Sequence, residues 1–285
     1  MNLLSLVGGI LRRIREQQLG GRAAQTAYFL LAAVLPSLMI IVTVVGSMSV
    51  WDDGAWLETV MGMGLPPVIS EPLLAEIENV TVGPIGKQVV LSALVGIYLS
   101  VRAIDAMLQG VNTAWGLRDH RPWHRQMLRV LLLTIFIILG FCGILIMLAM
   151  GARVREWLQM YGQISQQLSI LVIYLRWPAV MLIIHQIVWV IYRFGAERRI
   201  GKRWITWGSL VATLGLLSVI GGFKLYVERV ADLGATFGSL GTAMGLAILC
   251  YLCTFTVLIG AALDCELKRK KNEQTRRSQH PQIDS

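Results

Sequence analysis

Charge is scarce in this sequence. Asp, Glu, Lys and Arg together make up only 15% of the 285 residues, whereas ordinary soluble domains carry about 25%. Apolar residues make up 55% of the chain. A soluble protein of this length needs a far more polar surface, so the composition excludes an ordinary soluble domain and indicates a polytopic membrane protein.

The chain also lacks the motifs of the common hydrolases and nucleotide-binding enzymes. It contains no GxSxG, no HExxH and no Walker lysine. His120 and His124 lie beside Asp119, but Pro122 separates the two histidines and no third strong metal ligand is near. We therefore expect no enzyme, no bound metal and no cofactor. The basic charge is better explained by membrane topology than by binding to nucleic acid.

Cysteine is rare, and the few cysteines do not form a disulfide framework. All four lie in or beside apolar runs: Cys142, Cys250, Cys253 and Cys265. The stretch CYLC has the spacing of a redox motif, but an apolar helix lacks the electropositive, accessible setting that a reactive thiolate requires. We interpret these cysteines as small packing residues.

The N-terminus lacks the order of a signal peptide, because its arginines follow the apolar stretch instead of preceding it. Four apolar residues recur at helical spacing: Leu3, Val7, Ile10 and Ile14. This pattern predicts an amphipathic helix on the membrane surface. The alternative is a frayed terminus.

Six segments are apolar enough to cross a bilayer, for which ~20 helical residues suffice. They lie near 27–50, 88–111, 127–150, 170–193, 204–225 and 237–263. The fold class that we predict is therefore all-α: a six-transmembrane-helix bundle.

The charges that are present alternate with these spans. Basic clusters precede the first span, separate the second from the third and the fourth from the fifth, and follow the sixth. The first connection, about 51–87, is acidic instead. The positive-inside rule then places both termini in the cytoplasm, and five spans would break the alternation.

Three parts follow from this topology. Residues 1–26 form a cytoplasmic amphipathic segment, and residues 27–265 form the membrane domain with a periplasmic loop at about 51–87. Residues 266–285 form a basic cytoplasmic tail. We expect the tail sequence KRKKNEQTRRSQHPQIDS to be disordered and drawn to anionic headgroups.

Glycine is concentrated in the stretch GATFGSLGTAMG, residues 234–245. No Lys-Ser or Lys-Thr ends it, so it is not a phosphate-binding loop. Gly234, Gly238, Gly241 and Gly245 recur at spacings that let two helix backbones approach closely in lipid. The alternative is a broken helix whose backbone groups face a cavity.

The same stretch carries a family resemblance. Residues 234–267, GATFGSLGTAMGLAILCYLCTFTVLIGAALDCEL, resemble the C-terminal signature of the YihY/BrkB family of bacterial inner-membrane proteins. AYFLLAAVLPSL, residues 27–38, resembles the first-span motif of that family. One departure is Ala262, where the family usually has glutamate. The resemblance implies a six-span protein of the bacterial inner membrane. It brings no established chemistry, and the family's former name, ribonuclease BN, is regarded as mistaken.

Ionisable residues inside apolar spans are candidates for function, because an unpaired charge there costs several kcal/mol. Arg102 and Asp105 are three residues apart and could form a local ion pair or line a cavity. Arg176, beside Trp177, could snorkel to the outer headgroups or bind an anion such as a lipid phosphate. His185 fits a hydrogen bond between helices better than a proton relay.

The function that we expect is transport or handling of lipid or another amphiphile by an inner-membrane protein. The alternative is a non-catalytic membrane scaffold. The expected partners are membrane lipids, with anionic headgroups at the basic loops and tail, and no nucleic acid. The protein partner that we consider is a second copy of the chain.

Overall fold

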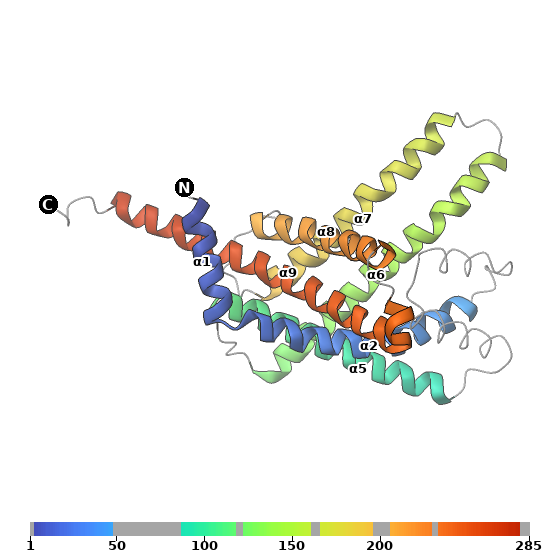
Figure 1. The fold of residues 1–285 in the computed structure, drawn as a ribbon, viewed down its shortest axis with the longest axis horizontal. Helices are drawn as coiled ribbons and strands as arrows, with labels where there is room; N and C mark the ends of the chain where they lie inside the picture. Colours follow the sequence, from blue (N-terminus) through green and yellow to red (C-terminus); the bar gives the residue numbers. More distant parts are fainter. Residues whose placement is uncertain are drawn as a thin grey trace.

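A computed structural model describes residues 3–47, 87–117, 122–160, 166–195, 206–229 and 233–279. All regular secondary structure in these ranges is helical (Figure 1). The helices are α1 (Leu3–Glu16), α2 (Leu19–Ser47), α5 (Lys87–Ala114), α6 (Trp123–Met160), α7 (Gln166–Gly195), α8 (Trp207–Arg229) and α9 (Leu233–Gln279).

The six expected spans fall on the six long helices, α2 and α5 to α9. Five of these helices contain stretches long and apolar enough to cross a membrane: Ala93–Ala114, Trp123–Ile144, Pro178–Gly195, Trp207–Tyr226 and Ala243–Glu273. The first expected span falls on α2, and its last residues, 48–50, lie outside the described ranges, as does most of the 51–87 loop. The architecture therefore fits a polytopic membrane protein, while the count of six spans stays a prediction.

The local sequence explains two of the helix boundaries. Gly116 ends α5 with a φ of 65°, a conformation that glycine adopts at little cost. The amide of Gly116 donates to the Thr113 carbonyl, and that of Leu117 donates to the Asn112 carbonyl, which is a Schellman cap. At the start of α8, the amide of Ser209 donates to Thr206 Oγ1, while the amide of Thr206 donates to Ser209 Oγ.

One end of the bundle gathers the starts of α2, α6 and α8 and the last turns of α5 and α7, beside the C-terminal part of α9. The guanidinium of Arg129 on α6 lies 5.8 Å from the ring centroid of Phe194 on α7. Arg13 on α1 donates to the last carbonyl of α5, that of Ala114. Figure 1 shows α1 and the end of α9 on this same side. We call it the basic end, since most described Arg and Lys residues lie there.

The described core lies toward the basic end. Its largest fully buried apolar side chains include Leu19, Val111, Tyr192 and Leu258. Away from this end the helices expose large apolar side chains, for example Leu91 and Leu94 on α5 and Leu139 on α6. These surfaces suit contact with lipid chains. Trp123 and Trp207, the first residues of α6 and α8, are also exposed, which is typical of a membrane interface.

The N-terminal segment is helical, as predicted, and not frayed over Leu3–Glu16. Its apolar residues do not share one exposed face. Val7 and Leu11 are exposed, whereas Ile14 packs against the core. The helix therefore docks on the bundle by one side, and its contact with a membrane surface stays a prediction.

The prediction of a disordered tail is wrong for residues 268–279, because α9 continues without a break to Gln279. Two physical reasons explain the extension. Lys, Arg, Glu and Gln are strong helix formers, and no glycine or proline interrupts the chain between Gly260 and Pro281. Arg269 also pairs with Glu266 and Glu273, one helical turn to either side. Residues 280–285 lie outside the described ranges.

The glycine-rich stretch forms the first turns of α9, so it is helical from Leu233 onward. Gly241 and Gly245 are buried, as close packing predicts. The surroundings of Gly234 and Gly238 lie outside the described part of the chain. Whether the four glycines pack against one partner helix stays a prediction.

Candidate functional site

Arg102 and Asp105 lie side by side on α5, where the sequence places them one helical turn apart. Arg102 Nη1 is 3.8 Å from Asp105 Oδ2. Gln109, one turn further along α5, donates to the same oxygen at 2.9 Å, and Gln126 on α6 donates to Asp105 Oδ1 at 3.3 Å. These four residues, the Asp105 group, connect α5 to α6.

Arg102 is the exposed member of the Asp105 group. Its side chain is 45% exposed, although it lies inside the apolar stretch Ala93–Ala114. The guanidinium carbon is 5.3 Å from the ring centroid of Phe29 on α2, which is within the range of a cation–π contact. About three helical turns separate Arg102 from Ala114 at the basic end. A charged group at this depth needs water, a headgroup or an anion around its outer side.

Arg176 is placed by its backbone alone. It lies within α7, which contains the predicted fourth span. Its side chain is outside the part of the chain that the structure describes, so the choice between outer headgroups and a bound anion stays a prediction.

A second polar group lies where α7, α8 and α9 meet. The Tyr192 hydroxyl on α7 donates to the Val257 carbonyl on α9. The amide of Gly208, in the first turn of α8, donates to Asp264 Oδ1 on α9 at 2.7 Å. Asp264 therefore acts as a cap for α8 that comes from another helix.

Two glycines permit this close meeting of α8 and α9. A Cβ on Gly208 would collide with the backbone carbonyl oxygen of Gly260 and with the Asp264 carboxyl carbon. A Cβ on Gly260 would collide with the Gly208 carbonyl oxygen and the Tyr192 hydroxyl. Small residues at a crossing let two backbones approach this closely. The sequence contains one signal for this crossing, the pair of small residues Gly260 and Ala261 on α9, but this pair does not identify the partner glycine on α8.

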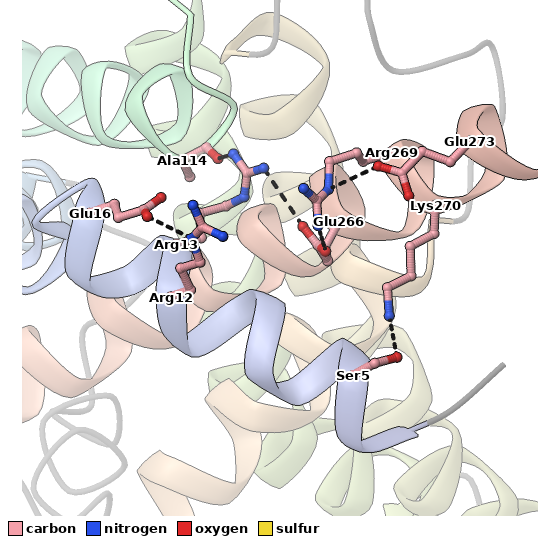
Figure 2. Close-up of polar contacts among 9 residues, drawn as sticks. All are labelled: Ser5, Arg12, Arg13, Glu16, Ala114, Glu266, Arg269, Lys270 and Glu273. Carbon is pink, nitrogen blue, oxygen red and sulfur yellow. Dashed lines mark hydrogen bonds and ion pairs between the residues drawn. The ribbon is translucent and has the colours of Figure 1, made fainter.

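The third polar group fastens α1 to the rest of the basic end (Figure 2). The Glu266 carboxylate on α9 is 2.6 Å from Arg269 Nη2 and 3.7 Å from Arg13 Nη2. Arg13 also donates through Nη1 to the Ala114 carbonyl at 3.1 Å. Lys270 donates to Ser5 Oγ at 2.8 Å. We call Arg13, Glu266 and Arg269 the α1 latch.

At the end of the last expected span, the sequence places Asp264 and Glu266 two residues apart, which predicts that they point in different directions and that both meet the basic tail. This is correct for Glu266, which pairs with Arg269. It is wrong for Asp264, whose bond goes to the Gly208 amide instead. The two carboxylates point in different directions because residues two apart on a helix do not share a face.

His185 behaves as the sequence indicated. Its Nδ1 lies 3.2 Å from Thr213 Oγ1, which joins α7 to α8 by a hydrogen bond. None of the four cysteines forms a disulfide with another, and their interpretation as packing residues stays a prediction. Within the described ranges, no three His, Cys, Asp or Glu residues come together as metal ligands.

Comparison with known proteins gives a consistent result. A family described as "Virulence factor BrkB" matches residues 10–284. The ribonuclease-like protein YfkH of Bacillus subtilis is 22% identical over 256 residues, covering 88% of this chain and 90% of that protein. A UPF0761 membrane protein of Chromobacterium violaceum is 26% identical over 178 residues, covering 59% of this chain and 40% of that protein. No solved structure matches the chain.

Proposed function

Because this chain belongs to the virulence factor BrkB family, we propose that it is an inner-membrane protein that binds and moves an anionic lipid or a similar amphiphile. One observation carries the proposal: Arg102 is half exposed inside an apolar span, with Asp105 beside it. We further propose that the protein is not an enzyme and that both of its termini lie in the cytoplasm.

The chemistry of Arg102 fits an anionic headgroup. A guanidinium has five N–H donors and binds phosphate or carboxylate through two parallel hydrogen bonds. The Asp105 contact involves Nη1, and Phe29 lies against the guanidinium. Asp105 is itself held by Gln109 and Gln126, so it fixes the position of Arg102 without a second cation. The side of the guanidinium that faces away from Asp105 and Phe29 is then directed to the surroundings of α5.

The surroundings of Arg102 favour an amphiphile over a small hydrophilic solute. The described apolar side chains next along α5, such as Leu94, Tyr98 and Ile97, are exposed. An amphiphile can place its headgroup on Arg102 and its chains along these residues, and both contacts are favourable. A hydrophilic solute could make only the contact with Arg102.

The test measures lipid movement by the purified protein. Wild-type protein is placed in vesicles that contain a trace of fluorescent anionic phospholipid, and its exchange between leaflets is followed. We expect Arg102→Gln to lower the rate by about tenfold, which corresponds to 1.4 kcal/mol, because it removes a charge-assisted bond to the headgroup. Arg102→Lys keeps the charge but loses the two-bond geometry, so its rate is expected to be intermediate.

The matched control is Arg12→Gln. Arg12 also pairs with an acid on its own helix, Glu16, but its side chain is 75% exposed and lies outside the apolar stretches. We expect this variant to exchange lipid at the wild-type rate. Wild-type vesicles that exchange lipid no faster than empty ones would contradict the proposal and favour the scaffold function.

A further inference from the structure

Asp264 is a buried carboxyl group that takes no part in the proposed lipid handling. Only 8% of the residue is exposed. Its Oδ1 accepts the Gly208 amide at 2.7 Å, while its Oδ2 is buried and has no hydrogen-bond partner in the described part of the chain. We propose that Asp264 is an exchangeable proton-binding site, which gains and loses a proton while α8 and α9 remain in contact.

The charged and titratable groups near Asp264 have partners other than Asp264. On α9 itself, Lys268 points its ammonium over the Trp115 ring at 5.9 Å, and Arg269 pairs with Glu266. On α1, Arg13 is bound to Glu266 and Ala114. On α7, the Tyr192 hydroxyl donates to Val257. At the start of α8, the described groups that face Asp264 are the Gly208 amide and the Thr206 side chain, and both are uncharged. No cation in the described ranges therefore neutralises this carboxylate.

A buried carboxylate that has no cationic partner among the described residues has two ways to exist. The ionised form is stabilised by the Gly208 amide and by the positive end of the α8 helix dipole. The neutral form avoids the cost of several kcal/mol for a lone charge in an apolar site. Because each form has its own source of stabilisation, the group is suited to exchange a proton.

A proton suits the site better than a metal ion. Hard cations require six or more oxygen ligands or several bound waters. In the described ranges, no three acidic, His or Cys side chains come together as ligands. A proton requires one oxygen, and Asp264 Oδ2 is such an oxygen.

Proton binding at Asp264 also has a route to the packing of the helices. The Gly208 amide is bound to a carboxylate by a charge-assisted bond, which is roughly twice as strong as the bond to a neutral carboxyl group. Gly208 and Gly260 place the α8 and α9 backbones in contact at the same point. Protonation therefore weakens the hydrogen bond that joins the two helices at this crossing. Such a coupling gives a membrane protein without an ATP-binding motif a means to respond to a proton gradient.

The competing explanation is that Asp264 only caps α8. Asp264→Asn separates the two roles, because the amide oxygen can still accept the Gly208 N–H but cannot take up a proton. Asp264→Leu removes both the cap and the proton site. Glu266→Gln is the matched control for a nearby carboxylate that already has two cationic partners.

The experiment is infrared difference spectroscopy of purified protein in lipid nanodiscs between acidic and alkaline pH. We expect the wild type to show the carbonyl stretch of a protonated carboxyl group that disappears at alkaline pH. This band should be absent in Asp264→Asn and retained in Glu266→Gln. Identical spectra for wild type and Asp264→Asn would overturn the proposal.

A second measurement uses the wild type alone, in case the variants do not fold. Dicyclohexylcarbodiimide reacts with protonated carboxyl groups in apolar sites, and mass spectrometry identifies the modified residue. We expect modification of Asp264 that falls at least tenfold as the pH is raised. Absence of modification at every pH would overturn the proposal. Neither measurement involves lipid exchange. The proton-binding proposal can therefore hold even if the lipid-handling proposal fails.

Discussion

Arg13 of the first helix lies 3.7 Å from Glu266 of the last long helix, so the two ends of the chain are fastened together at the basic end. Glu266 is almost fully buried, with its side chain only 2% exposed. Arg13 extends the connection to the C-terminal carbonyl of α5. The α1 latch therefore joins three elements that are far apart in the sequence.

The first prediction concerns this latch. Glu266→Gln removes the negative charge that faces Arg13 and Arg269. The buried Nε of Arg13 has no hydrogen-bond partner in the described structure even before the substitution, so Arg13 then also lacks a charged partner. We expect the free energy of unfolding to fall by about 1–3 kcal/mol. Thermal unfolding in detergent measures the change.

The control for the latch is Glu16→Gln. Glu16 also pairs with an arginine, Arg12, but more than half of its side chain is exposed. Exposed pairs contribute about 0–1 kcal/mol, so this variant should unfold close to the wild-type temperature. Equal losses in the two variants would show that burial of Glu266 does not matter.

The second prediction concerns the crossing of α8 and α9. Gly208→Ala places a methyl group against the Gly260 carbonyl, and neither backbone can yield without moving a helix. We expect a loss of about 1–3 kcal/mol in stability from overpacking. Gly221→Ala is the matched control on the same helix, because nothing lies within 4 Å of its Cβ position. It should be neutral or slightly stabilising, since alanine favours helix over glycine. If both variants behaved alike, the close approach would be refuted.

The third prediction concerns the contact between His185 and Thr213. A double-mutant cycle with His185→Ala and Thr213→Val isolates their interaction. We expect a coupling of roughly 0.6 kcal/mol, the average for hydrogen bonds between membrane helices. The bond from Thr213 to the Ser209 carbonyl is lost in both arms of the cycle and cancels. Additive effects of the two substitutions would mean that the histidine and threonine do not interact.

The fourth prediction concerns topology. Alkaline phosphatase fused after Glu76 is expected to be active, because the acidic first connection is exported, whereas a fusion after Ser285 is expected to be inactive. Enzyme activity in whole bacterial cells measures the side of each fusion. Activity in both places, or in neither, would contradict six spans with cytoplasmic termini.

Much of the fold could be predicted because the periodicity of apolar residues and the distribution of charge are local properties. The span expected at 127–150 falls on α6, and the one expected at 204–225 falls on α8. The helix ends were less predictable. The extension of α9 to Gln279 depends on helix propensity and on pairs such as Arg269 with Glu273, which a hydropathy argument does not include.

The candidate site was only partly predictable. The approach of Arg102 to Asp105 follows from their separation by three residues on one helix, and that of Gln109 to Asp105 follows from a separation by four. Gln126 and Phe29 come from other helices, so no local pattern could assign them. The sequence likewise suggested a bond between helices for His185 but could not name Thr213 as its partner.

The sequence by itself determined that the chain is a membrane protein of long apolar helices, because scarce charge and hydrophobic runs leave no other way to bury so much apolar surface. Only the tertiary structure decided which polar residues meet. Asp264 and Glu266 are two residues apart, yet one caps α8 through Gly208 and the other binds Arg13 of α1. The difference arises because helix packing brings a different neighbour to each face of α9, and a linear sequence does not contain that information.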